Sequence, residues 1–170
     1  YVGQVVWPSE EMLIRGYETQ RTDTFSYLRD TMKQMFNFAL ADEGDELVQY
    51  ALNRVQAIKN KQVDTSELVL SKSCKGKLNK DGSVDFSYYA NPDSMAQVRI
   101  ARALIAKGLG FTPGMKVAYV VNDASNRPMK VEPWIEGEEN GGISGYDCLF
   151  YAERLAAAIG RITEAFGWSA

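Results

Sequence analysis

Histidine is absent from this chain of 170 residues, and its absence limits the chemistry that the side chains can perform. Without imidazole there is no Ser-His or Cys-His nucleophile pair, and nearly all His-containing zinc sites are excluded. The two cysteines, Cys74 and Cys148, have no CxxC partner, so neither a metal knuckle nor a disulfide framework is indicated. Carboxylates, lysines, tyrosines and two thiols remain, and a reduced, cytoplasmic protein is expected.

Two acidic clusters could suggest a metal site or a general acid-base site. The first cluster contains Asp42, Glu43, Asp45 and Glu46. It lacks the spacing of a calcium-binding loop, which favours a solvated junction between helices. The second cluster contains Glu132, Glu136, Glu138 and Glu139. A charged surface loop is the simplest interpretation there, and a paired-carboxylate site is the alternative.

The charged residues are unevenly distributed along the chain. Because 19 Lys and Arg stand against 22 Asp and Glu, a formal net charge of −3, the chain is not a uniformly cationic nucleic-acid binder. Residues 54–80 nevertheless hold seven bases and two acids, and residues 99–130 hold six bases and one acid, so each segment has a balance of +5. A cationic face and an acidic back would fit a polyanion held on one side. Ordinary solvated faces are the alternative interpretation.

The first sixty or so residues predict a β-hairpin followed by two helices. Two β-rich runs, at residues 1–7 and 12–17, are separated by a turn-like tetrad. After them, apolar residues recur every three or four positions over about four to five turns, which predicts an amphipathic helix capped by Asp23 or Thr24. A second helical pattern spans residues 47–58, with acids in its first turn and lysines at its end. The two helices are expected to form an αα-hairpin.

The middle of the chain predicts an exposed loop and a third helix. Residues 71–82 are small, polar and cationic, which indicates an exposed loop or the tip of a β-ribbon. The third helix is expected to open at Asn91-Pro92-Asp93 and to end at Gly108. Its predicted apolar face contains Met95, Val98, Ala101, Leu104 and Ile105.

The C-terminal part predicts a strand and a long final helix. Residues 115–121 read as a strand, residues 122–145 as a loop rich in Gly, Pro and Glu, and residues 149–166 as the helix, which ends at Gly167. The expected fold class is therefore α+β, mostly helical, with a few short strands and a preceding β-hairpin. No apolar run reaches the roughly 18 residues needed to cross a bilayer, so no membrane partner is expected.

Four segments resemble, in order, the C-terminal part of a family B, archaeal-type DNA polymerase. Tyr1-Val2-Gly3 is similar to the end of the family's K-K-R-Y-[AV]-G motif, and residues 15–23 (RGYETQRTD) are similar to its R-G-x-E-x-x-R-[RT]-D motif. Residues 101–121 resemble its A-R-x-L-x-x-x-G…P-G…I-x-Y-V-V stretch, and residues 146–167 resemble its closing helix, Y-D-x-x-Y-Y…I-x-x-A-F-G. The resemblance spans essentially the whole chain.

This resemblance implies that residues 1–20 are the C-terminal β segment of the palm and that residues 21–170 are the thumb. A thumb of this family curls over the primer–template duplex behind the active site during DNA replication or repair. The chain would then be a fragment of a DNA-directed DNA polymerase, a nucleotidyltransferase, without catalytic residues, metal ligands or cofactors of its own. Two magnesium ions would be held by palm carboxylates of the full-length enzyme. The expected partners are the duplex DNA, the palm and other domains of the same polymerase, and a sliding clamp that binds residues beyond 170.

A grip that is independent of DNA sequence must rely on phosphate contacts from lysine, arginine, hydroxyl and backbone N–H groups. The candidate DNA-binding residues are Tyr1, Arg15, Arg21, Lys72, Lys75, Lys77, Lys80, Tyr88, Gln97, Arg99 and Arg102, with the last four expected along the exposed side of the third helix. Arg15 and Arg21 could instead pair with Glu18 or Asp23. Lys107 and Lys116 are interpreted as solvated.

Two positions depart from the family pattern, and two other functions stay open. Ala96-Gln97 stands where many relatives have Pro-His, and Lys75-Gly76-Lys77 stands where they have a threonine-arginine-proline type of sequence. The chain could instead be a helical protein-interaction or scaffold domain that uses its acidic surface. It could also be the natural small subunit of a split polymerase, although a start inside a motif and without Met favours a fragment.

Overall fold

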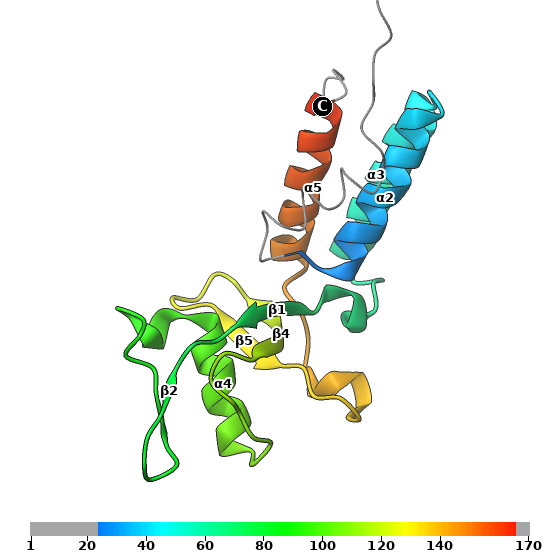
Figure 1. Cartoon of the computed structure of the whole chain (residues 1–170). Helices are drawn as coiled ribbons and strands as arrows, with labels where there is room; N and C mark the ends of the chain where they lie inside the picture. The colour runs from blue at the N-terminus through cyan, green and yellow to red at the C-terminus, as the bar shows by residue number, and fades with distance from the viewer. Residues whose placement is uncertain (1–23, 166–170) are drawn as a thin grey trace, which may run out of the picture.

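The computed structural model describes residues 24–165, which form two adjoining groups of elements (Figure 1). Helices α2 (Ser26–Leu40), α3 (Gly44–Lys59) and α5 (Cys148–Ala165) lie side by side and are called the helical lobe. The strands, the ribbon and helix α4 between residues 70 and 133 are called the sheet lobe. The expected α+β, mostly helical fold class is confirmed. The predicted hairpin at 1–20, and with it the candidates Tyr1, Arg15 and Arg21, falls outside the described residues.

The helical lobe forms because each of its helices has one apolar stripe. Helix α2 buries Met32, Met35 and Phe36, and the predicted αα-hairpin with α3 is confirmed. The predicted cap at Thr24 is wrong, because α2 begins after Phe25 and has no side-chain cap. Phe25 is fully buried with its ring 5.0 Å from that of Tyr151, so packing rather than capping positions the start of this helix.

Three antiparallel strands form the sheet in the order β1–β4–β5, with Leu70 opposite Tyr119 and Val121 opposite Val131. Their bounds are Leu70–Ser73 for β1, Lys116–Asp123 for β4 and Lys130–Pro133 for β5. The predicted strand at 115–121 is confirmed. The prediction of an unbroken loop over 122–145 is wrong, because β5 and a short 3₁₀ helix, η3 (Glu139–Gly142), lie within it.

Helix α4 (Ala96–Ala106) packs against β4 and β5, and it begins later than predicted. The Asn-Pro-Asp sequence forms a separate 3₁₀ turn, η2 (Pro92–Ser94), which ends at Met95 in an extended conformation. The buried face of the helix contains Ala96, Gln97, Val98, Ile100 and Ala101. The predicted face was partly wrong, because Ile105 is 43% exposed.

Hydrogen bonds join the two lobes at the start of α5. The Val121 backbone N–H donates to the Tyr151 hydroxyl at 2.9 Å, and the Asp147 N–H donates to the Val121 carbonyl at 3.0 Å. The Tyr146 hydroxyl donates to the Val63 carbonyl at 3.1 Å. The two bonds of Val121 tie the start of α5 to the central strand, so the helical lobe is fixed relative to the sheet. No helix within residues 24–165 is long and apolar enough to cross a membrane.

Candidate nucleic-acid interface

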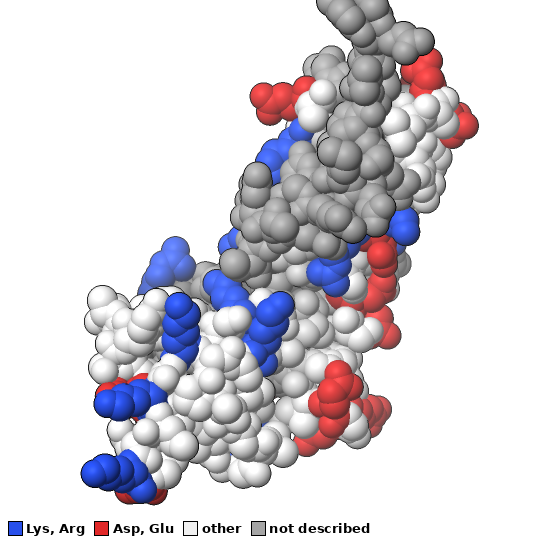
Figure 2. Space-filling view, in the orientation of Figure 1, with Lys and Arg blue, Asp and Glu red and all other residues white. Residues whose placement is uncertain are grey.

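All predicted DNA contacts within residues 24–165 lie in the sheet lobe, and most come from the ribbon and α4. The ribbon pairs β2 (Lys77–Leu78) with β3 (Val84–Asp85) in antiparallel fashion. Figure 2 shows Lys and Arg side chains over β1 and the ribbon, with Asp and Glu beside them on the ribbon and also near η3. This face therefore carries both signs of charge, and the predicted division into a cationic face and an acidic back stays a prediction.

The tip of the ribbon presents Lys77 and Lys80 to solvent on a turn that is held internally. The Asp81 carboxylate accepts hydrogen bonds from the Ser83 hydroxyl at 2.6 Å and from its N–H at 2.9 Å. These bonds hold the pKa of Asp81 below its ordinary value. The sequence predicted either an exposed loop or the tip of a β-ribbon here, and the structure shows the ribbon. The Asp85 carboxylate interacts with the charge of Lys77, which reduces the charge that the ribbon offers to a phosphate.

At the base of the ribbon, Lys75 is positioned by two tyrosines. Its ammonium Nζ donates to the Tyr88 hydroxyl at 3.1 Å and lies 4.8 Å from the centroid of that ring. Its backbone N–H donates to the Tyr89 hydroxyl at 3.0 Å. The bond to Tyr88 raises the pKa of Lys75, so the side chain stays charged at neutral pH. Because Tyr88 is 63% exposed, its ring can also stack on a base or a sugar.

The prediction that helix α4 presents Gln97, Arg99 and Arg102 along one exposed side is wrong. Gln97 is only 7% exposed, and Arg99 is half-buried with its guanidinium donating to the Met129 carbonyl. Arg102 is exposed, but it forms an ion pair with Asp93 at 2.5 Å. The difference arises because Gln97 lies on the buried face of α4, which packs against the sheet, together with Val98 and Ala101. Of these three side chains, Arg102 alone is exposed, whereas Arg99 is half-buried.

The two basic segments of the sequence meet in a groove of about 360 Å³ at the start of α4. Lys72 contributes from β1, Arg99 from α4 and Arg127 from the loop between β4 and β5. We call this the basic groove. Arg127 was not among the predicted contacts, and its place in the 99–130 segment is the signal that could have identified it. The fold thus brings together cations that are far apart in the sequence.

Other charged residues have structural partners. The Arg54 guanidinium carbon lies 3.6 Å from the centroid of the Tyr27 ring, and its Nε donates to the Thr31 hydroxyl, so this base of the 54–80 segment stabilises the α2–α3 pair. Glu132 accepts hydrogen bonds from Asn122 and from the N–H and hydroxyl of Ser144. Within residues 24–165, no group of three or more His, Cys, Asp or Glu could hold a metal ion.

Comparison with known proteins finds similarity to a DNA polymerase. No protein-family model matches the chain. A DNA polymerase of Pyrococcus horikoshii is 23% identical over 164 residues, which cover 93% of this chain and 12% of that protein. The chain therefore spans about an eighth of the length of the polymerase that it matches. It is similar to a region of a DNA polymerase.

Proposed function

We propose that this chain is the thumb of a family B DNA polymerase, and that its sheet lobe holds the primer–template duplex through the phosphate backbone. The observation that carries the proposal is the gathering of Lys and Arg from both basic segments on one face of the sheet lobe. Such a face neutralises phosphates irrespective of base sequence, as a protein that moves along DNA requires. The similarity to one region of a DNA polymerase supports the assignment to a polymerase.

In this proposal the nucleotidyl transfer occurs elsewhere in the enzyme. The two magnesium ions are held by palm carboxylates outside this chain, and the thumb contributes affinity for the duplex and therefore processivity. The palm and the other polymerase domains are its protein partners, together with a sliding clamp that binds residues beyond 170.

The salt dependence of duplex binding tests the role of the ribbon. The double variant Lys77→Ala/Lys80→Ala should lower the slope of log K against log salt by up to about 2, because each neutralised phosphate contributes about 0.9. The control is Lys33→Ala/Lys59→Ala, which removes the same charge from exposed positions of the helical lobe. Fluorescence anisotropy with a labelled duplex measures both slopes. Equal slopes in the two variants would argue against the ribbon as a DNA contact.

One observation favours a second candidate, a protein-interaction domain. An apolar groove of about 360 Å³ runs between α3 and α5, and the side chains of Val48 and Leu52 on its rim are exposed. In that case the chain would not shift a labelled duplex at low salt even at high protein concentration, and neutralising the ribbon would leave polymerase activity unchanged. Either result separates the two functions.

A further inference from the structure

The basic groove has the charge of an anion-binding site. Lys72, Arg99 and Arg127 reach it from three different elements, and none of its lining residues is Asp or Glu. Hydrogen bonds hold both arginines, since Arg99 donates to the Met129 carbonyl and Arg127 donates to the Ala124 carbonyl at 3.0 Å. For Lys72, residues 24–165 provide neither an ion pair nor a hydrogen bond to its ammonium. The groove therefore carries positive charge with no carboxylate in its walls to neutralise it.

The N-terminus of α4 opens into the same groove and adds hydrogen-bond donors. Met95, Ala96 and Gln97 line the groove, and Met95 is the N-cap of this 11-residue helix. The helix has neither a side-chain cap nor an acidic residue in its first turn. Its first backbone N–H groups, which have no partners inside a helix, and the positive end of its dipole are therefore available to an anion.

Two buried polar side chains of the groove are left without hydrogen-bond partners. Gln97 is 7% exposed and Tyr119 is 2% exposed, and within residues 24–165 neither the Gln97 amide nor the Tyr119 hydroxyl forms a hydrogen bond. Burial raises the pKa of Tyr119 to about 12, so its hydroxyl remains a neutral donor at pH 7. The polar atoms of both side chains keep contact with solvent, and both residues line the groove, so the Gln97 amide and the Tyr119 hydroxyl are available to a ligand there.

We propose that the basic groove binds a phosphate monoester, as found at the 5′ end of a nucleic-acid strand or on a free nucleotide. Three cations and a helix N-terminus exceed the single negative charge of a backbone phosphodiester, whereas a monoester carries up to two negative charges. The backbone N–H groups and the Gln97 amide supply donors for the phosphate oxygens, and the arginines supply charge-assisted bonds. This inference goes beyond the grip on the duplex, because it assigns to the basic groove a preference for a phosphate monoester over the phosphodiesters of the duplex backbone.

Small phosphate esters test the chemistry of the site directly. Methyl phosphate, a monoester, should shift the backbone amide resonances of Ala96, Gln97 and Val98 in NMR spectra of the full 170-residue chain. Dimethyl phosphate, a singly charged diester, should bind at least about tenfold more weakly, since it lacks one charge. No shift of these amides with methyl phosphate, or equal affinity for the two esters, would overturn the proposal.

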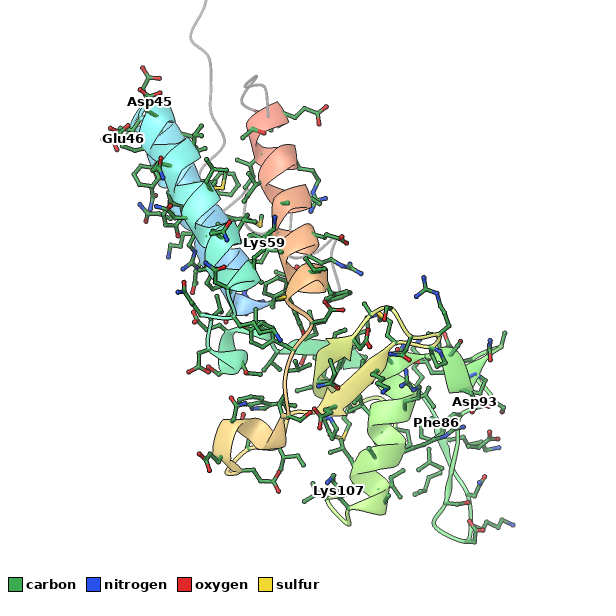
Figure 3. All side chains as sticks on the ribbon, turned by 180° about the vertical axis from the view of Figure 1, so that it is seen from behind. Asp45, Glu46, Lys59, Phe86, Asp93 and Lys107 are labelled. Carbon is green, nitrogen blue, oxygen red and sulfur yellow. The ribbon has the colours of Figure 1, made fainter. Side chains whose placement is uncertain are left out.

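Two variants connect the binding to the groove. Lys72→Gln should weaken the binding of methyl phosphate about fivefold to tenfold, while Lys107→Gln, which removes the same charge at the opposite end of α4 (Figure 3), should leave it unchanged. Gln97→Leu should weaken the binding of methyl phosphate, because it removes an amide that lines the groove and can donate to a phosphate oxygen. A folded Gln97→Leu chain that binds methyl phosphate normally would contradict the assignment.

Oligonucleotides then identify the source of the phosphate. A 5′-phosphorylated single strand is compared with the same strand ending in a 5′-hydroxyl, and with a nucleoside 5′-monophosphate. A preference for the phosphorylated strand over both assigns a strand end, and equal binding of this strand and the mononucleotide assigns a free nucleotide. If the strand with a 5′-hydroxyl binds as tightly as the phosphorylated strand, the groove does not recognise the phosphate monoester. The comparison is repeated with the Lys77→Ala/Lys80→Ala variant, which lacks only the ribbon lysines. A change in duplex binding without a change in the preference for the phosphorylated strand then separates the duplex grip from the binding of the monoester.

Discussion

At the residue scale, the structure separates charged and polar side chains that hold the fold from those that are free to bind. Arg54 belongs to a basic segment, yet its cation-π contact with Tyr27 and its bond to Thr31 commit it to the α2–α3 pair. Gln97 shows the opposite case, because its amide has no hydrogen-bond partner in residues 24–165 and it lines the basic groove. Composition alone treats the two alike, and only their surroundings distinguish a structural role from a binding role.

A substitution of Gly141 tests how tightly the loop after β5 is packed. Its φ is +64°, and a Cβ there would lie 2.1 Å from Cε3 of Trp134, so Gly141→Ala adds both backbone strain and a ring clash. We expect a loss of at least about 2 kcal/mol in the free energy of unfolding, measured by urea denaturation. Gly137→Ala is the control, because its φ is +89° but nothing lies within 4 Å of its Cβ. Equal losses in the two variants would contradict the packing against Trp134.

At the element scale, helices with long periodic stripes could be predicted and short irregular elements could not. The apolar repeats of α2, α3 and α5 extend over several turns, so each helix remains recognisable even where a single residue departs from the pattern. Strand β5 has four residues and ends at Pro133, which leaves no alternation to detect. The late start of α4 followed from the Asn-Pro-Asp turn, which forms its own 3₁₀ helix. The burial of Gln97, and hence the basic groove, escaped prediction because a polar side chain within the buried face of a helix interrupts the apolar pattern that marks that face.

The ribbon provides an element-scale prediction about pH. Bonds from Ser83 hold the pKa of Asp81 below its ordinary value of 3.8, so the ionised carboxylate stabilises the turn. This contribution is fully present above the ordinary pKa and is lost as the pH falls through the lower pKa of the folded ribbon. Acidification should therefore loosen the turn, observed as a pH-dependent chemical shift of the Ser83 amide. Asp81→Asn should remove this dependence, and its persistence in that variant would assign it to another group.

At the scale of the whole molecule, the net charge of −3 is a sum over distant regions. The acidic residues Asp45 and Glu46 lie at the end of α3 that is remote from the sheet lobe, as Figure 3 shows, and the basic groove lies within the sheet lobe. A polyanion bound to the sheet lobe thus avoids the acids of the α2–α3 junction. For this polarity to orient a bound strand, the two lobes must keep a fixed relation to each other.

That fixed relation depends on Tyr151, whose hydroxyl accepts the Val121 N–H across the junction between the lobes. Burial raises the pKa of Tyr151, so the hydroxyl stays neutral at physiological pH. Tyr151→Phe keeps the ring packed against Phe25 but leaves a buried backbone N–H unpaired, which should cost about 1–3 kcal/mol in the free energy of unfolding. Faster hydrogen exchange at the Val121 amide would locate the effect at the junction. Tyr146→Phe, which removes a less buried hydroxyl bonded to the Val63 carbonyl, should cost less and leave Val121 protected. If both variants exposed Val121 equally, the coupling between the lobes would have to be spread over the junction and could not depend on this one bond.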